Sequence, residues 1–98
     1  MTYSHTRVET ITPVTAKAYL VRLTGDERRL SVQLVLRLAN AMRADQWILP
    51  DKPSALSAGL VFDCQGRLLD GQHRLEAVVE SGVTVPMYVT YRVSAGGV

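Results

Sequence analysis

The chain has 98 residues, a length that fits a single domain spanning residues 1–98. Hydrophobic residues make up 47% of it and aromatic residues 6%, so we expect an ordered core filled mainly by Leu, Val and Ala. The net charge of +2 permits a nucleotide or nucleic-acid partner without requiring one. One cysteine, Cys64, excludes an internal disulfide, and no apolar run is long enough to span a membrane. We therefore expect a cytoplasmic protein with no membrane partner.

The first predicted elements are a strand over residues 7–11 and a helix that follows it at once. Thr12 is a favoured N-cap and Pro13 is favoured at the first helical position, so the helix should begin there and run to Leu23. Its core-facing stripe is predicted from apolar residues at helical spacing: Val14, Ala18 and Val21.

A second helix is predicted over residues 32–45, with Ser31 as its N-cap. It is apolar nearly all round, which leaves two interpretations open: it lies sandwiched in the core, or it buries one face against a second subunit. Its solvent side is marked by the polar residues Gln33, Arg37, Asn40 and Arg43.

Residues 45–59 are interrupted by prolines and a glycine, which end regular structure, so this stretch should be a loop. We interpret it as a connector rather than a lid. Its apolar residues are expected to cover an edge of the core: Trp47, Ile48 and Leu49.

The second half of the chain begins with a predicted β-hairpin, in which strands 60–63 and 67–69 flank a turn where Gly66 takes a positive φ. A helix should follow from Asp70-Gly71 to Ser81, and a last strand should cover residues 83–91. This order predicts an α+β fold, with a short mixed sheet that includes the hairpin and is packed by about three helices.

The junction between the hairpin and the following helix holds the residues with the clearest chemistry. A helix N-terminus exposes unpaired N–H groups, and Gly71 has no Cβ to block an anion. His73 and Arg74 add donors in the first turn, so the junction could bind a phosphate. The alternative is that Asp70 caps the helix and that both basic side chains are ordinary surface residues.

The sequence from Leu60 to Ala77, followed by Gly82 and by Val85 to Val89, resembles the core of the ParB N-terminal/sulfiredoxin superfamily. It is most similar to the short stand-alone ParB-like proteins of actinobacteriophages, some of which are labelled ParB-like nucleases. Residues 11–13 and the segment ending at Trp47 also match that group's pattern. The resemblance implies the ParB/sulfiredoxin-like fold and a nucleotide bound at the turn and helix.

The resemblance also implies which residues contact phosphate. Gly71 matches the family's glycine, Gln72 stands where sulfiredoxin has its cysteine, and the basic pair is matched by His73 and Arg74. Relatives have a further basic residue before the second helix, which Arg28 or Arg29 would match.

Gln72 cannot act as a thiol nucleophile, so sulfiredoxin activity is not expected, and any enzymatic activity would be at most that of a weak NTPase or nuclease. The resemblance makes a nucleoside triphosphate with Mg²⁺ the candidate cofactor. We assign no metal-binding residues, although the acidic and histidine side chains near the site could hold Mg²⁺: Asp63, Asp70, His73 and Glu76.

Three functions are therefore compatible with the sequence. The first is binding of a nucleotide or phosphate at the Gly71 turn, and the second is DNA binding, or nuclease action, by the same basic surface. The third is a non-enzymatic effector that binds a host protein or forms a homodimer through the apolar second helix. If the chain is phage-encoded, it would act in the host cytoplasm.

Overall fold

The computed structural model of the chain describes residues 2–23, 30–49 and 59–94. In chain order its elements are β1 (Thr2–Ile11), α1 (Pro13–Leu20), α2 (Val32–Arg43), β2 (Leu60–Phe62), β3 (Leu68–Asp70), α3 (Gln72–Ser81) and β4 (Val85–Ser94). The described strands form one mixed sheet in the order β1-β4-β2-β3. The predicted α+β class, with a mixed sheet, a hairpin and three helices, is confirmed at this level.

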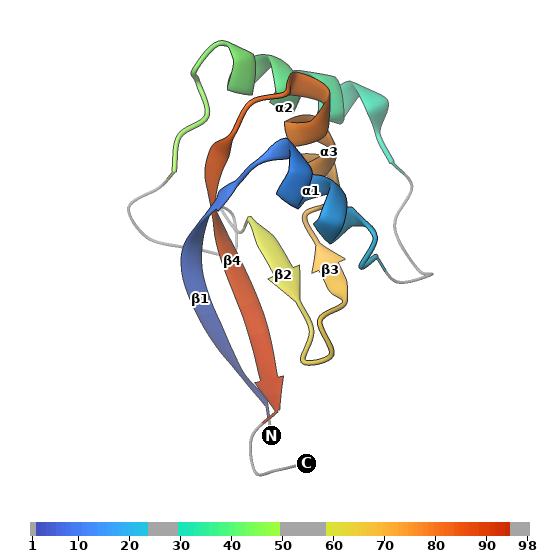
Figure 1. Cartoon of the computed structure of the whole chain (residues 1–98), viewed down its shortest axis with the longest axis vertical. Coiled ribbons are helices and arrows are strands. Elements are labelled where there is room, and N and C mark those ends of the chain that lie inside the picture. The colour runs from blue at the N-terminus through green and yellow to red at the C-terminus, as the bar shows by residue number, and fades with distance from the viewer. Residues whose placement is uncertain (1, 24–29, 50–58, 95–98) are drawn as a thin grey trace.

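The two outer elements of the chain form a long antiparallel ribbon. β1 pairs with β4 along its whole length, from Thr2 opposite Ser94 to Ile11 opposite Val85. Both strands are longer than predicted, because backbone pairing extends them through polar residues that show no apolar alternation. Figure 1 shows the helices gathered at one end of the sheet, while this ribbon and the β2–β3 hairpin extend towards the other end.

β2 is the strand of the hairpin that pairs with the ribbon. It runs parallel to β4, with Leu60 opposite Val89, and antiparallel to β3. Pro86 lies before the stretch of β4 that pairs with β2, so its missing N–H interrupts no bond to that strand. The predicted hairpin is confirmed, and so is the positive φ of Gly66, which is +82°.

The predicted core stripe of α1 is wrong. Val14 is 78% exposed and Val21 is 83% exposed, whereas Ala16 is fully buried. The N-cap prediction is confirmed, because the Thr12 Oγ1 accepts a hydrogen bond from the Thr15 N–H at 3.0 Å. The helix ends at Leu20, so Val21 lies in a turn outside it and no longer follows the helical spacing. The core-facing side is the other one, formed by Ala16, Tyr19 and Leu20, and Leu23 after the helix also packs against the core.

α2 begins as predicted, with the Ser31 Oγ accepting from the Leu34 N–H at 3.3 Å. The helix is not sandwiched in the core, because only one side of it is buried: Val35, Ala39 and Met42. Several of its apolar side chains reach solvent, with Val32 63% exposed and Leu36 42% exposed. The predicted polar side is confirmed as exposed.

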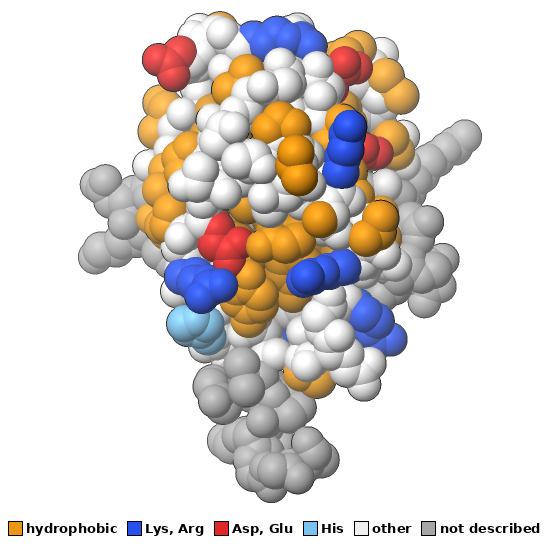
Figure 2. All heavy atoms as spheres, viewed as in Figure 1, with side chains coloured by type: hydrophobic (Ala, Val, Ile, Leu, Met, Phe, Trp, Pro, Cys, Tyr) orange, Lys and Arg blue, Asp and Glu red, His pale blue; other side chains and the backbone are white. Residues whose placement is uncertain are grey.

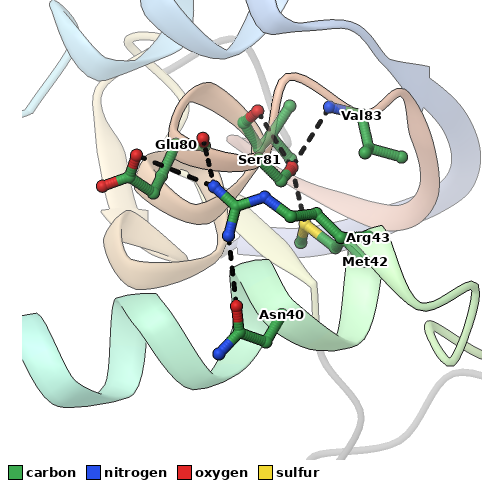
Figure 3. Close-up of polar contacts among 7 residues, drawn as sticks. Asn40, Met42, Arg43, Glu80, Ser81 and Val83 are labelled. Atoms are coloured by element: carbon green, nitrogen blue, oxygen red, sulfur yellow. Dashed lines mark hydrogen bonds and ion pairs between the residues drawn. The ribbon is translucent and has the colours of Figure 1, made fainter.

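Polar contacts at the end of α2 fix its position against α3 (Figure 3). The Arg43 guanidinium donates to the Glu80 carbonyl oxygen at 2.8 Å and to the Asn40 Oδ1 at 3.1 Å. The Ser81 Oγ lies 3.7 Å from the Met42 Sδ. The contacts of Arg43 with Glu80 and of Met42 with Ser81 join the two helices at the end opposite their N-termini.

After α2 the chain covers one edge of the core only in part. Trp47 packs there as predicted, and its Nε1–H donates to the Pro86 carbonyl oxygen at 2.8 Å. Ile48 is 81% exposed, so the expectation that it covers the core is wrong. Most of the predicted loop, residues 50–58, lies outside the described residues.

The core lies between the helices and one face of the sheet. Its largest fully buried side chains come from the strands and α3: Phe62, Ile11, Leu60, Leu68, Leu75, Met87, Val78 and Val89. α3 ends at Gly82, whose φ of +68° is the left-handed cap that the sequence predicted.

Candidate functional site

The turn between β3 and α3 is shaped by a glycine. Gly71 is the N-cap of α3 and has a φ of +109°, a conformation that favours glycine. A Cβ at this position would lie 2.4 Å from the Leu60 Cδ2 and 2.8 Å from the Gly59 carbonyl oxygen. Close packing against the start of β2 therefore accounts for the glycine, and its presence alone does not indicate a ligand.

Asp70 does not cap α3, so the part of the alternative that made it the N-cap is wrong. Its Oδ1 accepts from the Gly71 N–H at 2.9 Å, one residue before the helix. Among the described residues no side chain accepts a hydrogen bond from the N–H groups of the first turn, Gln72 to Arg74. These groups point out of the helix N-terminus and are available to an acceptor from outside the described chain.

His73 brings a second helix N-terminus to the same place. Its Nε2 accepts from the backbone N–H of Ser31, the N-cap of α2, at 2.9 Å. This hydrogen bond requires an unprotonated Nε2, so the imidazole carries its hydrogen on Nδ1. His73 therefore joins α3 to α2. The sequence analysis expected His73 to donate to a phosphate, but its Nε2 is an acceptor here and cannot do so.

Arg74 reaches the start of β2. Its Nη1 donates to the Gly59 carbonyl oxygen at 3.3 Å, and the residue is half-buried, as is Gln72. In the described parts of the chain its guanidinium takes part in no ion pair. We call this region the α3 corner, defined by Ser31, Gly59 and residues 71–74.

The structure thus brings four of the six predicted phosphate-binding residues together at the α3 corner. The other two, Arg28 and Arg29, lie outside the described residues, two or three positions before Ser31 in the sequence. The N-termini of two helices meet here beside the Arg74 guanidinium, which forms no ion pair with another described residue. This arrangement favours a bound anion, with N–H groups and Arg74 as its donors.

The acidic and histidine residues near the corner do not assemble into a metal site. Over residues 2–23, 30–49 and 59–94 there is no group of three His, Cys, Asp or Glu side chains that could hold a metal ion. Asp63 is occupied in the hairpin turn, where it accepts from the Arg67 N–H at 2.8 Å and from the Arg67 Nε at 2.7 Å. These bonds, the backbone one foremost, lower the pKa of Asp63.

A second polar cluster, which the sequence analysis missed and which we call the Glu9 cluster, lies between β1, β4 and α1. The Glu9 carboxylate accepts from the Tyr19 hydroxyl at 2.7 Å, from the Arg7 Nε at 3.0 Å and from the Tyr91 hydroxyl. Burial raises the pKa of Glu9, but these three hydrogen bonds outweigh it and hold the pKa below its ordinary value. Burial and the bond to Glu9 raise the pKa of Tyr19.

The members of this cluster come from β1, α1 and β4, so no local motif marks them. One signal was present in the sequence. Arg7, Glu9 and Ile11 alternate along a strand, so a core-facing Ile11 predicts that Glu9 points to the same face.

Comparison of the chain with protein-family models, with curated proteins and with solved structures finds no match. The resemblance to the ParB/sulfiredoxin superfamily therefore stays a prediction from the motif. Within the described part of the chain, no helix has the length and apolar character that a membrane crossing requires.

Proposed function

We propose that the chain binds a nucleotide, through its phosphate groups, at the α3 corner. One observation carries this proposal: the His73–Ser31 hydrogen bond joins the N-termini of α2 and α3, so that the positive ends of both helix dipoles meet beside Arg74. An anion placed there would be stabilised by charge and by direct hydrogen bonds.

The residues have separate roles in this proposal. The N–H groups of Gln72 to Arg74 donate to phosphate oxygens, and Arg74 supplies the charge and a planar pair of donors. Its hydrogen bond to Gly59 orients the guanidinium, and His73 fixes the position of α2. Arg28 and Arg29 are proposed as further contacts on the basis of the family resemblance alone.

The resemblance to ParB-like proteins supports the same residues and suggests a nucleoside triphosphate with Mg²⁺. The described residues offer no metal-binding group, so a Mg²⁺ ion would be held mainly by the phosphates themselves. The proposal includes binding only.

Calorimetric titration tests the proposal with CTP, ATP, GTP and inorganic phosphate, each with Mg²⁺. We expect binding of at least one nucleotide, and an affinity at least tenfold weaker in Arg74→Ala. Arg37→Ala is the matched control, because Arg37 is an exposed arginine on α2 and its removal changes the net charge equally. No binding at millimolar ligand, or equal affinities in the two variants, would contradict the proposal.

A second candidate function rests on the exposed apolar side of α2. A groove of about 320 Å³ lies between α2 and α3, lined by five apolar residues and by Glu76 and Glu80. We propose that this groove would serve an effector that binds a host protein or a second copy. Light scattering tests the second-copy form: a dimer that Val32→Asp converts to a monomer supports it, and a monomeric wild type at high concentration removes it.

A further inference from the structure

The two edge strands of the sheet, β3 and β1, differ in length and in cover. β3 has three residues, and the chain after α1 pairs with its outer edge. The Leu68 N–H donates to the Arg22 carbonyl oxygen at 2.8 Å, and Leu23 forms a parallel bridge with Leu68. β1 has ten residues and, within the described parts of the chain, pairs on one side only, with β4. Its outer edge therefore leaves a row of backbone donors and acceptors for a further strand.

The outer edge of β1 lacks the features that usually keep edge strands from pairing. The strand contains no proline and no lysine, and its register with β4 is continuous from Thr2 to Ile11. The side chains from Ser4 to Val8 and that of Thr10 are exposed. Val8 is 49% exposed and lies on the face of the strand opposite to that of the buried Ile11. A strand this long and regular is suited to pairing with another strand at its edge.

The charges of β1 favour a second copy of β1 as that strand, because they are complementary to themselves. Figure 2 shows an acidic, a basic and a histidine side chain in succession along the β1 side of this face, in agreement with the alternation of Glu9, Arg7 and His5. In an antiparallel pair of β1 strands centred on Val8, Arg7 of each copy lies opposite Glu9 of the other. A centre at Arg7 or at Glu9 would instead place two like charges opposite each other, which is destabilising. The sequence of β1 therefore selects one register.

The side chains of β1 are able to form these contacts. The Arg7 side chain is 60% exposed and binds Glu9 of its own strand through Nε, so the rest of its guanidinium can reach Glu9 of a second copy. The Glu9 carboxylate accepts three hydrogen bonds, and a carboxylate has about four acceptor sites. On the other face of the strand, the same register pairs Thr6 with Thr10 and Val8 with Val8, which are also favourable cross-strand pairs.

We propose that two copies of the chain pair through β1, in the antiparallel register centred on Val8. The two sheets then form one continuous sheet across a two-fold axis, and both β1 edges are covered. The interface shares no residue with the α3 corner or with the groove between α2 and α3, so the proposal does not depend on either proposed function. The α3 corner follows β3, at the opposite edge of the sheet, and stays accessible in this dimer.

Sedimentation equilibrium tests the proposal up to millimolar protein. We expect a monomer–dimer equilibrium in the wild type. Val8→Lys places two lysines opposite each other at the two-fold axis and should raise the dimer dissociation constant at least tenfold. Val14→Lys is the matched control, because Val14 is 78% exposed on α1, and it should change the constant less than twofold.

Disulfide formation tests the register. Cys64 is exposed, so both variants are made in a Cys64→Ser background, and diamide is the oxidant. Val8→Cys should form a disulfide-linked dimer, because the two thiols lie opposite each other at the axis. Thr10→Cys is the control. Its two thiols would lie about 14 Å apart along the strands, beyond the reach of a disulfide.

Several results would overturn the proposal. A wild type that stays monomeric at millimolar concentration would do so directly, and so would equal dissociation constants for Val8→Lys and Val14→Lys. A dimer that Val32→Asp abolishes and Val8→Lys leaves intact would assign the interface to the groove between α2 and α3. Disulfide-linked dimers formed equally by Val8→Cys and Thr10→Cys would contradict the register.

Discussion

The α3 corner and the Glu9 cluster are assembled from the sequence in opposite ways. The corner is built mainly from consecutive residues, 71–74, so a local motif points to it. The Glu9 cluster collects Arg7, Tyr19 and Tyr91 from three elements, and no spacing in the sequence brings them together. The comparison shows that a contiguous motif locates candidate residues, whereas their partners depend on how distant segments pack.

The largest effect is expected at the glycine of the corner. In Gly71→Ala the new Cβ would meet the Gly59 carbonyl oxygen and Leu60, and the backbone would be strained, at a cost of about 3 kcal/mol in unfolding free energy. Gly66→Ala is the control, because Gly66 has a φ of +82° and nothing within 4 Å of a Cβ. It should cost about 1 kcal/mol. Equal losses in urea unfolding would show that packing against β2 does not require Gly71.

The next effect tests the Glu9 cluster. Glu9→Gln removes the charge that accepts hydrogen bonds from Tyr19, Tyr91 and Arg7, and we expect a loss of about 1–2 kcal/mol. Glu80→Gln breaks only an exposed ion pair of 3.9 Å and should cost less than about 0.5 kcal/mol. A Glu9→Gln variant as stable as Glu80→Gln in urea unfolding would show that the cluster adds nothing to the fold.

The pH dependence of stability sharpens the same point. The pKa of Glu9 lies lower in the folded chain than its ordinary value of 4.5, so the unfolded state takes up the proton first as the pH falls. The stabilisation by Glu9 is therefore present above pH 4.5 and is lost as the pH falls through the lowered pKa. We expect the stability difference between wild type and Glu9→Gln to shrink between pH 6 and pH 3. If urea unfolding gave the same stability difference at every pH in that range, the lowered pKa of Glu9 would be contradicted.

The smallest effect concerns α1, where the sequence misled us. Val21→Ser should change the unfolding free energy by less than about 0.5 kcal/mol, because Val21 is 83% exposed. Leu20→Ser should cost several times more, since Leu20 packs against the core. A larger loss in Val21→Ser would restore the stripe predicted from helical spacing.

Local signals predicted much of the fold. Thr12 and Ser31 cap their helices, and Gly66 and Gly82 take the positive φ that their turns require. Each of these depends on atoms within a few residues in sequence. The strand order and the core-facing side of α1 depend on tertiary packing, which propensity and spacing do not contain.

The candidate site shows the same difference between what a local motif predicts and what tertiary packing decides. The sequence placed His73 and Arg74 in the first turn of α3. Their partners lie in earlier segments of the chain: the Ser31 N–H is 42 residues and the Gly59 carbonyl 15 residues away in sequence. A residue pattern cannot show that a histidine will accept a hydrogen bond from another helix. The Glu9 cluster was missed for the same reason, because its tyrosines are distant in sequence.

The most direct test of nucleotide binding at the α3 corner is a ¹H–¹⁵N correlation spectrum of the labelled chain, recorded during titration with CTP or ATP and Mg²⁺. We expect the largest shifts on the amides of Ser31 and of residues 72–74, and little change in those of Arg22 and Tyr91. A spectrum unchanged at millimolar nucleotide, or shifts concentrated at Arg22 and Tyr91, would contradict nucleotide binding at the α3 corner.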